Sequence, residues 1–229
     1  QHRAVLSQWW QLIRDCPDAA ASDAGDMPPA DDAPIRADRS IPSGLANFAF
    51  RFGFRAPPTL VRFRLLDPDQ DLAGHRDITV PVSELSAAPP PDIDRVYVVE
   101  NDVTALAFPS VLRAIVIFGR GYRVSDLAPL GWLGEKTVVY AGDLDTHGFA
   151  ILNRFRMTFP AVTSILMDTE TLLSHREHWT HERAPTTADL ANLTPAEQEV
   201  YDALRNDYYG EGVRLEQERI SYDRILAVL

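Results

Sequence analysis

From residue 95 onward the chain alternates short apolar runs with segments of helical period. The apolar runs predict buried strands at 96–99 (VYVV), 114–119 (AIVIFG), 137–145 (TVVYAGDLD) and 162–168 (VTSILMD). The intervening segments predict a short helix at 102–108, a helical turn region at 124–133 and an amphipathic helix at 149–159. Strands this apolar, separated by helices, predict an α/β fold with a parallel sheet that helices cover on both faces.

The pattern divides the chain into three parts. Residues 1–56 predict an N-terminal arm, with a helix at 1–14 and a Pro-, Ala- and Asp-rich linker at 17–43. Residues 57–94 predict a connecting β segment, with strands at 59–66 and 77–80. Residues 95–229 predict the main domain, which ends in C-terminal helices at 170–182 and 194–209 and in a run at 213–220 that fits helix or strand.

Acidic residues follow these strands at their carboxyl ends, where ligands bind in sheets of this kind. Asp143 and Asp145 are two apart and therefore point the same way in a strand. Glu100 follows the first strand and reaches the pair if the first and third strands are neighbours. Gly142 and Gly148 flank the pair and allow the backbone to approach closely.

Carboxylates held together repel one another unless a cation lies between them or one is protonated. Oxygen ligands of this kind suit Mg²⁺ or Mn²⁺. A lone Asp-x-Asp more often caps a helix than binds a metal, but the glutamate at an earlier strand end favours the metal. The acidic residues therefore predict a metal-centred site that stabilises a charged phosphoryl transition state.

Composition narrows the class of protein. The formal net charge of −11 argues against a chain that binds nucleic acid on its own. Cys16 is the only cysteine, which excludes an internal disulfide and a cysteine-based zinc site and fits a reducing cytoplasm. No apolar run reaches roughly 18 residues, so we expect no membrane-spanning helix and no membrane partner.

The longer motifs resemble a known family. VYVVEN followed by GDLDTHG resembles the TOPRIM domain, the metal-binding fold of topoisomerases, primases and several nucleases. VRFRLLDP, IVIFGRGY, GDLDTHGFAILNRFR, LMDTETLL and RLEQERI together resemble the C-terminal half of JetD, the nuclease subunit of Wadjet plasmid-defence systems. The resemblance covers residues 57–229, and a more remote one links the chain to topoisomerase VI, whose nucleophilic tyrosine comes from a separate DNA-binding domain.

The JetD resemblance implies an endonuclease that depends on Mg²⁺ or Mn²⁺ and hydrolyses plasmid DNA. It implies that Glu100 acts as general acid/base or metal ligand and that Asp143 and Asp145 hold the metal. The partners implied are the SMC-like motor subunits, and these or a second copy of the chain would present the DNA. Two other functions stay open: a DNA- or complex-binding module with a degenerate TOPRIM site, and a strand transferase that uses a tyrosine.

Several other residues are candidates for the site, each with a structural alternative. Glu216 and Glu218 either complete the metal site, as the family motif hints, or form a charged run paired with Arg214 and Arg219. His147 either binds phosphate or shuttles a proton, or it holds the turn by hydrogen bonds. The basic residues around the second strand, Arg113, Arg120 and Arg123, are candidate contacts to DNA phosphate.

Overall fold

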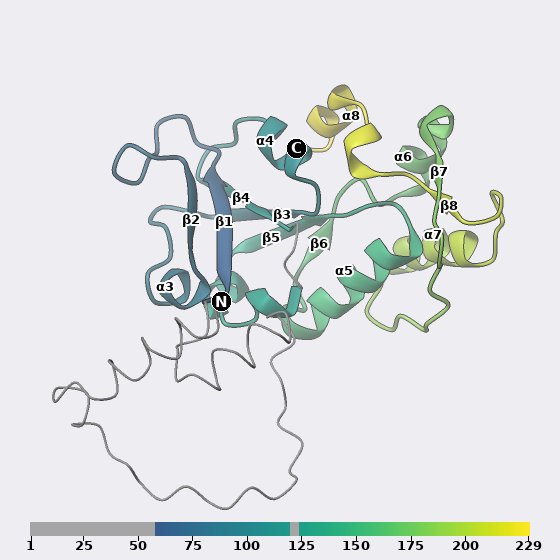
Figure 1. The fold of residues 1–229 in the computed structure, drawn as a ribbon, viewed down its shortest axis with the longest axis horizontal. Helices are drawn as coiled ribbons and strands as arrows, with labels where there is room; N and C mark the ends of the chain where they lie inside the picture. The colour runs from purple at the N-terminus through teal and green to yellow at the C-terminus, as the bar shows by residue number, and fades with distance from the viewer. Residues whose placement is uncertain (1–57, 120–123) are drawn as a thin grey trace, which may run out of the picture. The chain divides into compact units, whose positions relative to one another are not determined.

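A six-stranded sheet forms the centre of the computed structural model, which describes residues 58–119 and 124–229 (Figure 1). The strands are β1 Leu60–Leu65, β2 Asp77–Pro81, β3 Arg95–Val99, β4 Ala114–Phe118, β5 Thr137–Ala141 and β6 Thr163–Ser164. Their order is β2-β1-β4-β3-β5-β6, with β3 to β6 parallel and β1 antiparallel to both β2 and β4. The predicted α/β class is confirmed, whereas the arm at 1–56 and the loop residues Arg120 and Arg123 lie outside the described residues.

The register of this sheet decides where the acidic residues meet. Val99 at the end of β3 lies opposite Phe118 of β4 on one side and Ala141 of β5 on the other. The first and third strands of the parallel set are therefore neighbours. Strands β1 and β2 come from the 57–94 segment and join the same sheet through β4, so this segment is an integral part of it.

Helices cover both faces of the sheet, α5 (Thr146–Thr158) on one and α4 (Asp102–Ala107) on the other (Figure 1). Alternate residues of each strand enter opposite cores because side chains in a strand alternate between its faces. The core under α5 includes Val96, Val98, Ile115, Ile117, Phe149, Leu152 and Phe155; the core under α4 includes Tyr97, Val99, Val116, Phe118, Ala105 and Phe108. Each such fully buried large apolar side chain stabilises the fold by about 1.5–3 kcal/mol.

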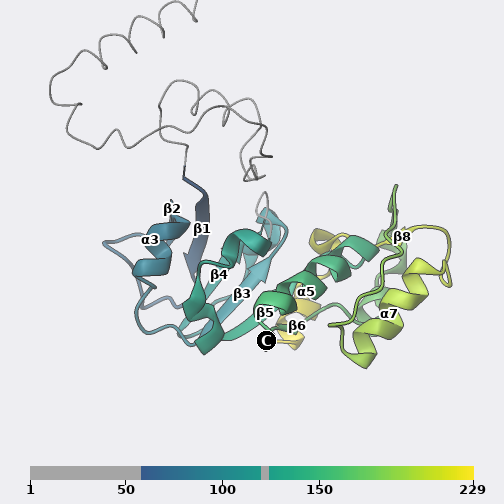
Figure 2. The same cartoon turned by 90° about the horizontal axis from the view of Figure 1, so that it is seen from below.

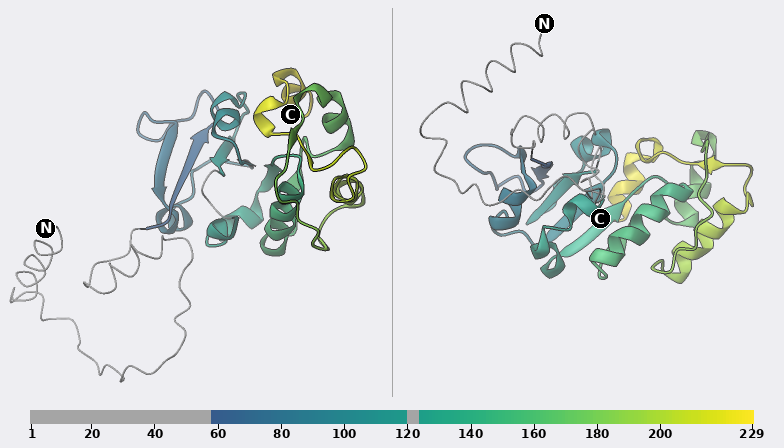
Figure 3. Two further views of the ribbon diagram at one scale, coloured as in Figure 1. Left: turned by 45° about the vertical axis from the view of Figure 1, so that its right-hand side comes forward. Right: turned by 60° about the horizontal axis from the view of Figure 1, so that its bottom comes forward.

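Shorter elements complete the unit. They are the helices α3 Val82–Ala87, α6 Thr169–Ser174, α7 Pro195–Arg205 and α8 Tyr222–Ala227, with 3₁₀ helices at Val124–Leu127, Gly131–Glu135, Arg176–His178 and Gln217–Arg219. Helix α7 lies beside α5 (Figures 2 and 3). It begins with the capping box that the sequence indicates, since Thr194 Oγ1 accepts a hydrogen bond from the Glu197 backbone. None of the helices in the described part is long and apolar enough to span a bilayer.

Two predicted elements are much shorter in the structure than the sequence pattern indicates. The strand predicted at 162–168 is reduced to the two residues of β6, because Leu166 has a φ of +65°, which a strand does not accommodate. The helix predicted at 170–182 ends at Ser174, where the Ser174 hydroxyl and His175 Nδ1 both donate hydrogen bonds to the Thr171 carbonyl. These side chains compete for the carbonyl that the next helical turn would use.

The residues after α6 instead form a small antiparallel ribbon. Strand β7 (Thr180–His181) pairs with β8 (Val213–Arg214), and the 3₁₀ helix Gln217–Arg219 follows. This settles the ambiguous run at 213–220, which combines a short strand with a helical turn. Backbone hydrogen bonds between Leu144 and Leu215 attach the run to the segment after β5. The ribbon therefore lies next to the carboxyl end of the sheet.

A buried ion pair joins α5 to α7. Arg156 donates from Nη1 to Glu197 Oε2 at 2.5 Å and from Nη2 to Glu197 Oε1 at 2.9 Å. Arg156 also donates from Nε and Nη1 to the carbonyls of Val162 and Asn192, so each of its three nitrogens has a partner. Burial alone would raise the pKa of Glu197, but hydrogen bonds from Arg156, Ser164 and Thr194 outweigh it and lower the pKa to about 2.

Candidate functional site

Five carboxylates line a cavity of about 590 Å³ at the carboxyl ends of β3 and β5. The residues that line it are Glu100, Asp143, Asp145, His147, Thr180, His181, Glu182, Arg183, Ala184, Arg214 and Glu216. Glu100 directly follows β3, and the two aspartates follow β5. The register of these neighbouring strands therefore brings Glu100 beside the aspartate pair.

Glycines make this close approach possible. A side chain at Gly142 would place its Cβ 2.8 Å from Glu100 Oε1, and one at Gly148 would collide with the Asp143 carbonyl. Asp145 caps helix α5, because its Oδ1 accepts a hydrogen bond from the Gly148 amide at 2.7 Å. Asp145 can therefore cap the helix through Oδ1 and still present Oδ2 to Arg214, another residue of the cavity.

The guanidinium of Arg214 lies between the two aspartates. Its Nη2 is 2.5 Å from Asp143 Oδ2, and its Nε is 3.1 Å from Asp145 Oδ2. Glu216 Oε1 is 3.7 Å from the same Nη2. Neighbouring carboxylates need either a cation between them or a proton on one of them. In this structure the Arg214 side chain supplies the cation.

The carboxylate oxygens of the cavity are chemically suited to bind a hard divalent cation. Five carboxylates face only two arginines, Arg183 and Arg214, so negative charge is in excess. Carboxylate oxygens are the ligands that Mg²⁺ and Mn²⁺ prefer. As the side chains stand, however, no three His, Cys, Asp or Glu residues in the described ranges are grouped to hold an ion. The side chain between the two aspartates is that of Arg214.

Burial raises the pKa of two acids of the cavity, Glu100 and Asp145. It is the main cause that raises the pKa of Glu100 to about 7, and the charges of Asp143 and Asp145 add to the effect. The Tyr140 hydroxyl, which donates a hydrogen bond to Glu100, opposes the rise, as does Arg214. Burial likewise raises the pKa of Asp145 to about 6, with Glu182 and Asp143 as further causes. Glu100 can therefore both bind and release a proton near neutral pH.

Six residues of the cavity were not predicted as site residues, and three of them carry a full charge: Glu182, Arg183 and Arg214. Glu182 is buried, and its two oxygens accept hydrogen bonds from the Thr146 amide at 3.1 Å and the Thr146 hydroxyl at 2.8 Å. It thereby ties the segment after β7 to the start of α5. No sequence signal indicates Glu182, whereas Arg214 stands two residues before Glu216 and so shares its side of an extended segment.

Of the other residues predicted for the site, two line the cavity and two of the described ones lie outside it. His147 lines the cavity, with its Nε2 2.8 Å from the Ala184 carbonyl, which holds the turn by a hydrogen bond. Glu216 lines the cavity, but Glu218 is exposed outside it, where its Oε2 accepts a hydrogen bond from Asn101 Nδ2 at 2.8 Å. Arg113 precedes β4 at the opposite end of the strands and pairs with Asp94 at 2.5 Å, so it does not join this site.

A fully buried glutamine braces the strands that carry the acids. Gln217 Nε2 donates a hydrogen bond to the Ala141 carbonyl at 3.0 Å, and its Oε1 accepts one from the Asn101 amide at 3.2 Å. Its backbone amide donates to Asp143 Oδ1 at 2.9 Å. One residue thus fixes the ends of β3 and β5 and orients an aspartate.

Replacement of Gln217 with leucine is expected to lower the free energy of unfolding by about 3 kcal/mol. The leucine has a similar size but leaves the Ala141 carbonyl and the Asn101 amide without their side-chain partners. Denaturant titration measures the change. The matched control is Gln198→Leu, which removes a hydrogen bond to Asp202 on α7 and should cost no more than about 0.5 kcal/mol. Equal costs for the two variants would contradict the bracing role.

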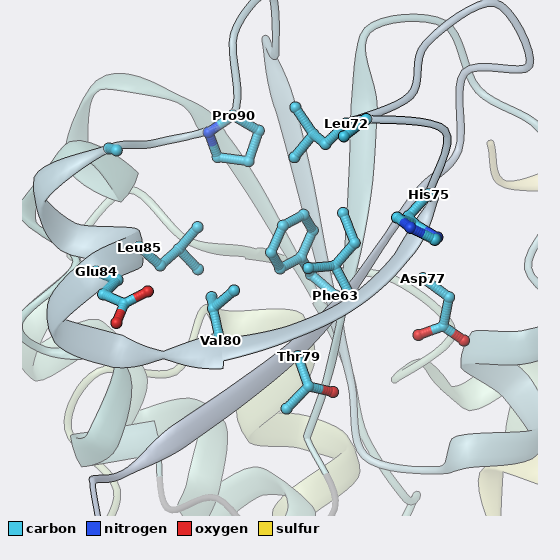
Figure 4. Close-up of a pocket in the computed structure, with 12 residues that line it drawn as sticks. Phe63, Leu72, His75, Asp77, Thr79, Val80, Glu84, Leu85 and Pro90 are labelled. Carbon is cyan, nitrogen blue, oxygen red and sulfur yellow. The ribbon is translucent and has the colours of Figure 1, made fainter.

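A second cavity, of about 600 Å³, lies between β2 and α3 and differs in character. Figure 4 shows Phe63, Leu72, Val80, Leu85 and Pro90 around it, with His75 and Asp77 toward one end. Its walls are mainly apolar and carry no group of facing carboxylates. The concentration of acidic groups therefore distinguishes the cavity at β3 and β5 as the candidate for chemistry.

The fold and the site define an α/β protein that gathers carboxylates at the carboxyl ends of neighbouring parallel strands. The family model described as "Wadjet protein JetD, C-terminal" matches residues 53–229, and the chain belongs to this family. It is thus a component of a Wadjet defence system, which confirms the resemblance that the motifs indicate. A search of the curated proteins finds no match.

Proposed function

We propose that the chain is a DNA endonuclease subunit that depends on Mg²⁺ or Mn²⁺ and hydrolyses plasmid DNA within the Wadjet system. The observation that carries the proposal is the convergence of Glu100, Asp143, Asp145, Glu182 and Glu216 in one cavity. Five carboxylates in one cavity, two of them buried, call for a cation beyond the arginines present. Membership of the JetD family supports the same activity. The parallel strand arrangement and the three acids at 100, 143 and 145 favour a TOPRIM-like domain.

Asp143 and Asp145 would hold the ion, with Glu216 close enough to contribute. A bound divalent ion would supply electrostatic stabilisation of the charged phosphoryl group. Glu100 would exchange a proton at its carboxylate, taking one from water or giving one to the leaving oxygen, because its pKa is raised to about 7. The Tyr140 hydroxyl orients that carboxylate.

Water is the nucleophile that the cavity favours. Among the described residues, no tyrosine lines it. Tyr140 comes nearest, but it is buried, its hydroxyl is hydrogen-bonded to Glu100, and burial raises its pKa well above 10. A tyrosine held in this way is a poor nucleophile toward a phosphodiester, which argues against a strand transferase and for hydrolysis.

Partners would deliver the DNA. The net charge of −11 and the acidic cavity repel phosphate, so the isolated chain should bind DNA weakly. SMC-like motor subunits, or a second copy of the chain, would bring the duplex to the cavity. Arg183 and His147 at its wall would then contact the DNA backbone.

Arg214 favours one alternative, a complex- or DNA-binding module whose acidic site no longer binds metal. Its ion pairs with both aspartates already compensate part of their charge. Calorimetric titration with Mn²⁺ discriminates the two functions: saturable binding that Glu100→Gln weakens supports the enzyme, and complete absence of binding supports the module.

The direct test is a plasmid-nicking assay with Mn²⁺ on the full chain together with its motor partners. Asp143→Asn is expected to lower the nicking rate by at least about 100-fold, because it removes a charged metal ligand. Asp223→Asn, at an exposed position of α8, is the matched control and should cut within about twofold of the unaltered protein. Equal cleavage by the two variants would remove the aspartate pair from the mechanism.

A further inference from the structure

Each aspartate of the cavity has one oxygen committed to the backbone and one left for a cation. Asp143 Oδ1 accepts a hydrogen bond from the Gln217 amide, and Asp145 Oδ1 accepts one from the Gly148 amide. The remaining oxygens, Oδ2 of both residues, are the atoms that Arg214 contacts at 2.5 and 3.1 Å. A divalent ion that binds the pair through these oxygens must compete with the guanidinium for them.

Arg214 lacks the features of a fixed structural arginine. Its Nε is buried and makes no hydrogen bond, although it lies near Asp145 Oδ2, and its side chain is 32% exposed. Arg156, by comparison, is 8% exposed and donates hydrogen bonds from Nε, Nη1 and Nη2. Arg214 also extends from β8, a strand of only two residues. The side chain can therefore leave the aspartates at a smaller cost than Arg156 could leave Glu197.

We propose that Arg214 is an exchangeable counter-ion: it neutralises the aspartate pair when no metal is bound, and a divalent ion displaces it. The proposal rests on the metal-dependent function above and deepens it, because it makes Arg214 a positioning residue that sets the affinity of the site for metal. In the metal-free state the guanidinium compensates the charge of the two aspartates, and in the metal-bound state the divalent ion does so. The displaced guanidinium stays at the cavity wall, held there by the pairing of β8 with β7.

Calorimetric titration of the full chain with MnCl₂ alone tests this exchange. Arg214→Gln is expected to bind Mn²⁺ at least about tenfold more tightly than the unaltered protein, since the competing charge is gone. Arg219→Gln is the matched control, because it removes a neighbouring arginine that pairs with Glu216, at 2.9 Å, and should change the affinity by no more than about threefold. Equal or weaker binding by Arg214→Gln overturns the proposal, since a purely structural arginine would weaken binding when lost.

A measurement on the unaltered protein keeps the test decisive if Arg214→Gln does not fold. Titration with Mg²⁺, followed through the Nε–H resonances of the arginines, should shift the Arg214 signal and leave that of Arg156 unchanged. An unmoved Arg214 signal at saturating Mg²⁺ overturns the exchange, as does the absence of any metal binding. Tighter Mn²⁺ binding by Arg214→Gln, together with no metal-dependent cleavage by the unaltered protein and its motor partners, would instead overturn the nuclease function and leave the exchange standing.

Discussion

Replacement of Glu100 with glutamine is expected to lower Mn²⁺-dependent plasmid nicking by at least about 100-fold and, at the same time, to stabilise the metal-free protein at pH 8. The loss of activity follows from the proposed proton transfer, which general acid–base groups typically accelerate by about 10²–10⁴. The gain in stability follows from burial, which raises the pKa of the Glu100 carboxyl from its ordinary 4.5 to about 7. Opposite effects on activity and stability are a known mark of functional sites.

The sign of the pH dependence follows from the same shift. Above pH 7 the folded protein holds an ionised Glu100 that burial disfavours, and the full destabilisation applies. As the pH falls from 7 toward 4.5, the folded state binds a proton that the unfolded state does not, so the penalty is relieved. The stability difference between Glu100→Gln and the unaltered protein should thus be largest at pH 8 and small near pH 5.

Urea unfolding in the presence of a chelator, at pH 5 and pH 8, measures this difference. Glu135→Gln is the control, because Glu135 is exposed and precedes β5, whereas the aspartates follow that strand, and its replacement should change neither nicking nor stability. A Glu100→Gln variant that cleaves normally would exclude the proton-transfer role. A variant with the same pH dependence as the unaltered protein would show that the carboxylate is not held in a costly environment.

Replacement of Glu197 with alanine is expected to lower the free energy of unfolding at pH 7 by about 3–5 kcal/mol, the usual cost of leaving one partner of a buried pair uncompensated. Arg156, 8% exposed, would keep its charge but lose both carboxylate bonds. The pKa of Glu197 is lowered to about 2, so the pair stabilises the fold fully above pH 4.5 and is lost as the pH falls through about 2.

Thermal or urea unfolding of purified variants gives this value. Asp189→Ala provides the comparison, since it removes a fully exposed partner of Arg205 and is expected to cost less than about 0.5 kcal/mol. Similar losses for the two variants would mean that the α5–α7 pair contributes no more than an ordinary surface pair.

The sheet could be predicted because its strands are buried on both faces. Strands β3, β4 and β5 are runs of apolar residues, and the observed bounds agree closely with those predicted for β3 and β4. The predicted strand at 137–145 ends earlier, at Ala141, because the residues after it turn into the cavity and cap α5. Elements of two residues, such as β6, β7 and β8, have no period that a pattern can reveal.

The contrast between regular strands and very short elements also decides how much of the site could be predicted. Glu100, Asp143 and Asp145 meet because neighbouring parallel strands end at one edge of the sheet, and that follows from strand order. Arg214 and Glu182 reach the cavity, and Gln217 reaches the strand ends beside it, through the β7–β8 ribbon and the turn after it. The position of this ribbon depends on tertiary hydrogen bonds such as those between Leu144 and Leu215. Sequence spacing carries no information on such contacts.

The brace at Gln217 has a consequence for the synthesis of the protein. The hydrogen bond between the Gln217 amide and Asp143 joins residues that are 74 positions apart. During translation Glu100, Asp143 and Asp145 are therefore synthesised well before Arg214, which pairs with the aspartates, and before Gln217, which orients Asp143. A nascent chain carries the acids without an assembled pocket, so competence for the proposed DNA cleavage would arise only after translation has passed the β8 segment.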